Sequence, residues 1–175
     1  MANLENPVDY LQSEHHLLRD AVDITNKLLA NKDDVFFHKQ MHDLIIFFRN
    51  YGEIYHFPKE EYILYPILRG RSNLLPPNYV HDILDNHDDF KALIADMEHC
   101  YELNDCELLR RVTKDYLNEL VHHLSEEEAR IFKEALKLLS DVEQKRIVSE
   151  FIALDEKHGD KIQLIESLYK INAQL

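Results

Sequence analysis

Residues 56–66 read HFPKEEYILYP and lie inside a long segment whose apolar residues recur every three or four positions. That spacing is typical of an amphipathic helix rather than of a strand. His56 and Glu60 are four residues apart, so their side chains share one face of a helix. The same face carries Phe48 and Ile63, which are typical core residues. The stretch therefore predicts a long helix that directs an imidazole and a carboxylate into the interior of the protein.

The same spacing continues along the chain, and the alternation that marks strands never persists. Five helical segments are expected, beginning near Pro7, Asp34, Pro77, Asp105 and Ser140. Ser140 opens the fifth with a capping box, and Gly159 is expected to break it. Pro58 removes a backbone donor inside the second segment, which predicts a kink near His56.

The connections between the first four segments are short, at residues 31–33, 70–77 and 104–105. Short connections place neighbouring long helices antiparallel. The expected fold class is therefore all-α: an up-down-up-down four-helix bundle formed by residues 1–139. Residues 140–175 would add a C-terminal helical segment packed on this bundle, within the same single domain.

The composition argues against several classes of function. The 175 residues suit one domain, and the formal net charge is −13, from 33 acidic and 20 basic residues. Such a surface repels phosphate backbones, so nucleic acid is not an expected partner. No apolar run reaches membrane-spanning length, and the first thirty residues lack the pattern of a signal peptide, so we expect none. Cys100 and Cys106 match no metal or redox spacing and are expected to be free thiols, so we expect a soluble cytoplasmic protein.

Polar residues replace apolar ones on the four predicted helix faces. A buried, unpaired carboxylate costs several kcal/mol, and so many buried polar groups require a shared partner. Residues at one level of an antiparallel pair are equidistant from the connection between them, and the midpoints here fall on or close to the three connections. The mismatches amount to roughly one helical turn or less. One layer of the bundle is thus predicted to hold His15, His56, Glu60, His87, His123 and Glu127.

An internal repeat supports this layer. HFPKEEYILY at residues 56–65 aligns without gaps with HLSEEEARIF at residues 123–132, so that His56 matches His123 and Glu60 matches Glu127. A single His-x-x-x-Glu is a weak signal in a chain with 11 histidines, but two inward copies at one level are specific. Four imidazoles and two carboxylates suit a pair of first-row metals, with iron favoured and manganese or zinc as alternatives.

These motifs resemble those of the hemerythrin-like family, the HHE cation-binding domains. The resemblance rests on EHH at residues 14–16, HFPKEEYILYP, the NHD segment at residues 86–88 and HHLSEEEARIF at residues 122–132. It implies a bundle with a non-haem di-iron centre bridged by two carboxylates and an oxo or hydroxo group. On the matching positions it implies that Glu60 and Glu127 bridge. The repeat further indicates that His15 and His56 bind one iron, and that His87 and His123 bind the other.

The chain departs from the oxygen-carrying members of that family at two positions. Where they have a second histidine on the third helix this chain has Ile83, and where they have an aspartate it has Glu127. Fewer protein ligands leave open metal positions, so the expected function is binding or sensing of a small molecule: oxygen, nitric oxide or peroxide. A di-iron oxidoreductase or peroxidase, or an iron-handling protein, is the alternative, and a metal-free helical interaction module is a third. The residues alone do not decide between binding and catalysis.

Further residues lie near the predicted layer. Glu61 and Glu128 directly follow the two inward glutamates, and we expect them to support the ligands or to face solvent rather than to bind metal. Tyr116, one heptad before His123, is either a core residue or a hydrogen-bond donor near the centre. Gly52 either leaves room for a small ligand or allows close packing. Tyr65 is expected to pack in the core.

Overall fold

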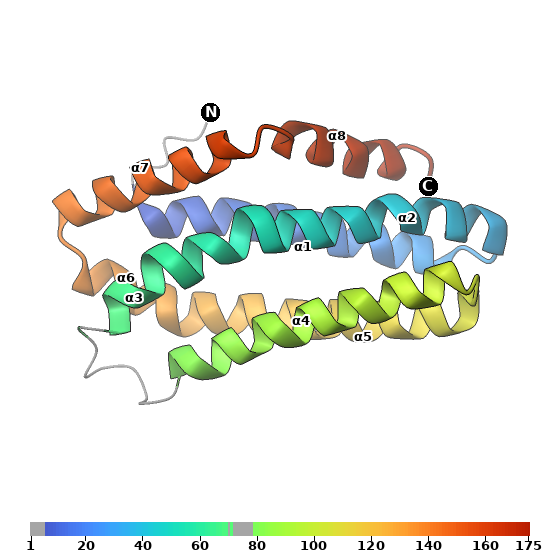
Figure 1. The fold of residues 1–175 in the computed structure, drawn as a ribbon, viewed down its shortest axis with the longest axis horizontal. Coiled ribbons are helices and arrows are strands. Elements are labelled where there is room, and N and C mark those ends of the chain that lie inside the picture. Colours follow the sequence, from blue (N-terminus) through green and yellow to red (C-terminus); the bar gives the residue numbers. More distant parts are fainter. Residues whose placement is uncertain (1–5, 70, 72–78) are drawn as a thin grey trace.

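The computed structural model describes residues 6–69, 71 and 79–175, and gives the backbone alone for residues 79–83. This part of the chain contains helices and short connections but no strand, which confirms the all-α class. Four long helices form the bundle: α1 (Pro7–Ala30), α2 (Asp34–Asn50), α4 (Tyr79–Glu102) and α5 (Cys106–Glu126). Helix α1 contacts α2, α2 contacts α4, α4 contacts α5, and α5 contacts α1 (Figure 1). A helical bundle results, and its up-down-up-down order stays a prediction.

Side-chain caps begin the helices close to the predicted positions. Asn6 accepts a hydrogen bond from the Asp9 backbone at 2.9 Å and so caps α1, with Pro7 as its first residue. Asp33 caps α2, and Asp105 caps α5 by accepting from the Leu108 backbone at 3.0 Å. Such caps satisfy backbone N–H groups that a helix leaves unpaired, which explains why short polar connections set the helix starts.

The second and fourth helical stretches both widen into π-helix. Beyond α2 the chain forms η1 (Tyr51–His56) and η2 (Lys59–Leu64) before α3 (Tyr65–Arg69), and beyond α5 it forms η3 (Glu127–Ile131) before α6 (Phe132–Leu138). Pro58 lies between η1 and η2, where its missing N–H interrupts the α-helical hydrogen-bond pattern. The chain forms wider turns there, and the kink that the sequence predicts near His56 stays a prediction.

The apolar core consists of two clusters with polar side chains between them. On α1, Leu11 belongs to one cluster and Leu18 to the other, and the buried His15 lies between them. Glu60 and Glu127 are flanked by members of the two clusters in the same way. The polar residues of the predicted layer therefore divide the core into two halves.

The C-terminal segment is a pair of helices, α7 (Asp141–Lys157) and α8 (Lys161–Asn172). The pair covers α1 and the α2 stretch, by which we mean the helical residues from α2 through α3 (Figure 1). The predicted capping box is present, because the Ser140 backbone donates to Glu143 at 3.0 Å. Gly159 separates α7 from α8 with a φ of 42°, a left-handed conformation that glycine adopts readily. Phe151 packs into one apolar cluster and Leu164 into the other, so the α7–α8 turn lies level with the polar side chains.

The connection predicted at residues 70–77 lies outside the described residues, apart from Arg71. Arg71 pairs with Glu143 at 2.5 Å, which attaches the end of the α2 stretch to the start of α7. None of the helices in the described part of the chain is long and apolar enough to cross a membrane.

Candidate metal centre

Four helical stretches bring six polar side chains to one level of the bundle, and we call these six residues the polar layer. They form two overlapping groups, and within each group the ligand-type atoms lie within 4.8 Å of one another. All six side chains are at most 2% exposed. The first group is His15, His56, Glu60 and Glu127, and the second is Glu60, His87, His123 and Glu127.

Glu60 directs one carboxylate oxygen to each group. Its Oε1 lies 4.0 Å from His15 Nε2 and 3.7 Å from His56 Nε2. Its Oε2 lies 3.6 Å from His87 Nε2, on the other side. A carboxylate oriented in this way is placed to bridge two cations.

Glu127 divides its oxygens in the same way. Its Oε2 lies 3.4 Å from His15 Nε2, and its Oε1 lies 3.4 Å from His123 Nε2. The Glu127 and Glu60 side chains come from the two sequence-repeat motifs, so the repeat is also a spatial repeat. Both carboxylates belong to both groups, as two bridging ligands would.

The chemistry of the layer fits bound cations. Within the described part of the chain, buried inward atoms lack a hydrogen-bond partner: Nε2 of His15 and His56, both oxygens of Glu60, and Oε2 of Glu127. Each unsatisfied buried group costs about 1–3 kcal/mol, so five together indicate a missing partner. Two ligand atoms that each lie about 2.1 Å from one metal are about 3.0–3.4 Å apart. The Nε2–carboxylate separations of 3.4–4.0 Å are comparable with that spacing and long for hydrogen bonds.

Glu61 and Glu128 hold the outer nitrogens of two histidines. His87 Nδ1 donates to Glu61 at 2.8 Å, and His15 Nδ1 donates to Glu128 at 2.9 Å. Arg19 also donates to Glu128, at 2.7 Å, and fixes its orientation. Because a carboxylate only accepts, these bonds place the ring proton on Nδ1 and leave Nε2 with a lone pair directed inward. Both glutamates therefore support the layer instead of joining it.

His56 has a similar partner that the sequence reasoning did not single out. Its Nδ1 donates to the buried carboxylate of Glu14 at 3.1 Å. Glu14 follows Leu11 by three residues on the buried face of α1, a spacing that could have revealed it. His123 differs, because its Nδ1 has no hydrogen-bond partner within the described residues.

Electrostatics keep two imidazoles of the layer neutral. Burial lowers the pKa of His56 and the pKa of His123 to about 4, so both rings are uncharged near neutral pH. Burial and the Glu127 carboxylate raise the pKa of Glu60 well above its usual range. Burial also opposes the charge on Glu127, but the neighbouring His123 and His15 lower its pKa overall. A divalent cation would favour the ionised form of both glutamates and remove this conflict.

Two tyrosines near the layer differ in role. Tyr65, which the sequence predicted only to pack, donates its hydroxyl to Glu127 Oε1, and both residues are buried. Tyr116 instead packs edge-on against Phe48 and Phe90, with ring centroids 5.0 and 5.7 Å away. The core interpretation of Tyr116 is thus the one that the geometry favours, and Tyr65 is the tyrosine in contact with the layer.

Gly52 makes room for an aromatic ring. A Cβ atom at this position would lie 3.3 Å from Phe57 Cε2, closer than ordinary packing allows. The Phe57 ring in turn stacks on the His87 imidazole, with centroids 4.1 Å apart. The space beside Gly52 is therefore filled by Phe57, which supports a histidine of the layer. The side chain of Ile83 lies outside the described residues.

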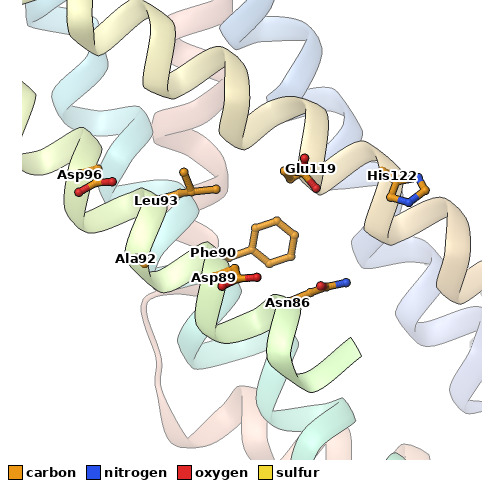
Figure 2. A pocket seen from close by; sticks show the side chains of 8 residues that line it. All are labelled: Asn86, Asp89, Phe90, Ala92, Leu93, Asp96, Glu119 and His122. Atoms are coloured by element: carbon orange, nitrogen blue, oxygen red, sulfur yellow. The ribbon is translucent and has the colours of Figure 1, made fainter. Parts of the chain in front are cut away.

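A groove of about 340 Å³ opens between α4 and α5, and Figure 2 shows the Phe90 ring directed from α4 toward α5 within it. Phe90 is 2% exposed, and its ring centroid lies 5.0 Å from that of His123. One aromatic ring thus separates this groove from the polar layer. Its lining combines the apolar side chains of Phe90, Ala92 and Leu93 with five polar ones, which are Asn86, Asp89, Asp96, Glu119 and His122.

Comparison with known proteins agrees with this geometry. A family model described as the Hemerythrin HHE cation binding domain matches residues 6–135, a range that includes the whole polar layer and ends before α7. No curated protein and no solved structure gives a significant match. Buried histidine and glutamate clusters of this kind fit a metal site. The match covers well over half of the chain, which therefore belongs to the metal-binding Hemerythrin HHE cation binding domain family.

Proposed function

We propose that the polar layer binds two iron ions and that Glu60 and Glu127 bridge them. His15 and His56 would complete the protein ligands of one ion, and His87 and His123 those of the other. The observation that carries this proposal is the sharing of both carboxylates between the two four-residue groups. Nitrogen and oxygen ligands without thiolate favour iron, with manganese or zinc as alternatives.

The function that this arrangement supports best is binding or sensing of a small molecule such as oxygen, nitric oxide or peroxide. Two histidines and shared carboxylate oxygens leave positions open on each ion for an oxo or hydroxo bridge and for such a ligand. Bound iron would supply the redox chemistry. The chain supplies neutral imidazoles at His56 and His123, a buried site that excludes water and a groove that ends one ring away from His123. We also place the protein in the cytoplasm, because Cys100 and Cys106 are both free thiols.

Anaerobic loading with ferrous iron tests this function. We expect two iron ions per chain and, after mixing with oxygen, a charge-transfer absorption band. A band that disappears when oxygen is removed supports reversible binding, and irreversible bleaching excludes it. His123→Ala should reduce the iron content. His122→Ala is a matched control, because His122 lies on the groove wall one residue away and should leave the iron content unchanged.

A di-iron oxidoreductase, such as a peroxidase, is the second candidate, and the Tyr65 hydroxyl favours it. This hydroxyl donates a hydrogen bond to Glu127 at the layer, so its proton lies where it would be available to a reacting group. Tyr65→Phe should then lower peroxide turnover while the iron content stays at the wild-type level. Equal turnover in the variant, or none in the wild type, would count against this function.

A further inference from the structure

A buried set of charges adjoins His56 on its outer side. Glu14 accepts from His56 Nδ1 through Oε2, and its Oε1 accepts from Lys59 Nζ at 2.8 Å and from Lys161 Nζ at 2.6 Å. Asp155 closes the set, because it accepts from the same two lysines. Two carboxylates and two ammonium groups thus alternate around a closed ring, which we call the charge ring.

The charge ring is costly to bury, and its geometry offsets that cost. Lys59 is fully buried and Glu14 is 3% exposed, while Asp155 and Lys161 are 15% and 20% exposed. A buried charge is tolerated only when it is paired and well hydrogen-bonded, and here each charge has two opposite neighbours. The Lys59 ammonium also donates to the Tyr55 carbonyl. The positive and negative charges balance, so removing one member leaves an uncompensated charge beside His56.

Two members of the charge ring come from outside the range that the family match covers. Asp155 lies near the end of α7 and Lys161 begins α8, whereas the match ends at residue 135. The turn between them is anchored from two sides. Tyr10 donates to Asp155 at 2.6 Å, and Tyr55 donates to Asp160. The carboxylates that support His15 and His87 have their hydrogen-bond partners within the bundle: Glu128 accepts from Arg19 on α1, and Glu61 accepts from His87 on α4.

We propose that the α7–α8 turn positions the His56 imidazole for metal binding, with Lys161 and Asp155 acting through Glu14. The inference rests on the proposed metal-binding function. Lys161 fixes one oxygen of Glu14, which leaves the other directed at His56 Nδ1. The ring proton stays on Nδ1, and Nε2 keeps its inward lone pair. The C-terminal helices are then positioning elements of the centre as well as a cover for the bundle.

A nitrogen-15 NMR measurement on the metal-free protein tests the positioning directly. The His56 ring signals, assigned by comparison with His56→Gln, should show a single tautomer with the proton on Nδ1. In Lys161→Met we expect mixed tautomers, and in Lys161→Arg the wild-type pattern should return. Lys157→Met is the control, because Lys157 is an exposed residue at the end of α7. This measurement needs no bound metal, so it separates failure of the positioning role from failure of the proposed function.

The second measurement is the rate at which a chelator removes ferrous iron from the loaded protein. Direct loss of a carboxylate that holds a histidine ligand weakens metal binding about 10–100-fold, so Glu14→Ala should release iron at least tenfold faster. Lys161→Met should release it at least threefold faster and shift the absorption bands. Lys161→Arg and Lys157→Met should behave as the wild type.

The charge-balanced variant Asp155→Asn/Lys161→Met separates loss of positioning from simple unfolding, because it removes one charge of each sign. It should fold, show mixed His56 tautomers and release iron faster than the wild type. Unchanged tautomers and release rates within twofold of the wild type would overturn the proposal. Failure of this balanced variant to fold would also overturn it, since the charge ring would then serve the fold and not His56.

Discussion

A histidine of the polar layer must be neutral before its inward nitrogen can bind a cation. Burial meets that condition at His56 and His123, where the pKa falls to about 4. Burial opposes charge at His15 too, but the neighbouring Glu127 and Glu128 carboxylates raise its pKa overall. Protons therefore compete with a metal more strongly at His15 than at His56 or His123. The same side-chain type thus has different acid sensitivity at different positions of one layer.

The stability of the metal-free protein should fall as the pH drops from about 6.5 to about 4. In that window an unfolded histidine takes up a proton, whereas folded His56 and His123 do not. Each such proton changes the free energy of unfolding by about 1.4 kcal/mol per pH unit. The contribution of His15 has the opposite sign: it is fully present below about pH 6.5 and is lost as the pH rises.

Urea denaturation across this range, with a chelator present, measures the effect. His123→Leu should lower the slope of the unfolding free energy against pH by about 1.4 kcal/mol per pH unit, the contribution of one proton. His122→Leu, the control, should keep the wild-type slope. Equal slopes for His123→Leu and the wild type would show that folded His123 is protonated in this window.

The buried Glu60 carboxyl is expected to destabilise the metal-free protein and to be needed for metal binding. Both of its oxygens lack a partner within the described residues, and its pKa is raised by burial and by Glu127. Glu60→Leu should therefore stabilise the metal-free protein by about 1–3 kcal/mol in urea unfolding and lower its iron content below two. Glu166→Leu, at an exposed site on α8, should change neither quantity appreciably. A destabilised metal-free Glu60→Leu would mean that the wild-type carboxyl has a partner.

Phe90 should control how fast small molecules reach the layer, because its ring separates the groove from His123. Phe90→Leu should accelerate nitric oxide binding to the iron-loaded protein severalfold in stopped-flow measurements, at a stability cost of about 1–2 kcal/mol. Phe47→Leu is a matched control, since Phe47 is equally buried but stacks on Tyr51, away from the groove. Equal acceleration in both variants would attribute the effect to general loosening.

At the scale of the elements, wide turns coincide with the polar layer. His56 ends η1, Glu60 lies in η2 and Glu127 begins η3, so three of the six side chains project from π-helix. Helical periodicity was enough to predict that these residues share one level, because that level depends on counting along each helix. It was not enough to predict the π-helix, since i→i+4 and i→i+5 bonding differ by one backbone partner that side-chain pattern does not encode. Pro58 indicated only that the regular pattern is interrupted.

Gly52 in η1 should tolerate only a small side chain. A Cβ atom there meets Phe57, which stacks on His87, so Gly52→Val should cost about 1–3 kcal/mol of stability and weaken iron binding. Gly52→Ala should be milder, because alanine favours helix over glycine by about 1 kcal/mol and offsets part of the crowding. Urea unfolding and iron titration of both variants measure these effects. A Gly52→Val protein with wild-type stability and iron binding would show that Phe57 moves freely.

At the scale of the whole molecule, two apolar clusters lie on either side of a polar layer. The C-terminal helix pair packs against both clusters. The layer was predictable because His15 and Glu127 replace apolar residues in a regular pattern. The charge ring was not, because Asp155 and Lys161 meet Lys59 only once α7 and α8 have packed on the bundle. Long-range packing of a polar residue leaves no periodic trace in the sequence. Tyr65 escaped prediction for the same reason, since its hydroxyl reaches a carboxylate on another helix.

Metal bound in the polar layer, as we propose, would bridge the two halves of the core, and its removal should weaken the whole fold. A ligand present at a hundredfold excess over its dissociation constant stabilises the folded state by about 2.7 kcal/mol per site. Two such sites would raise Tm by on the order of 10–20 °C in a chain of this size. Calorimetry of the iron-loaded and chelator-treated protein measures this difference. His123→Ala should show a much smaller difference, whereas His122→Ala should match the wild type. Equal Tm values with and without two bound iron ions would mean that the metal-free layer is already satisfied, which its five inward atoms without a partner among the described residues argue against.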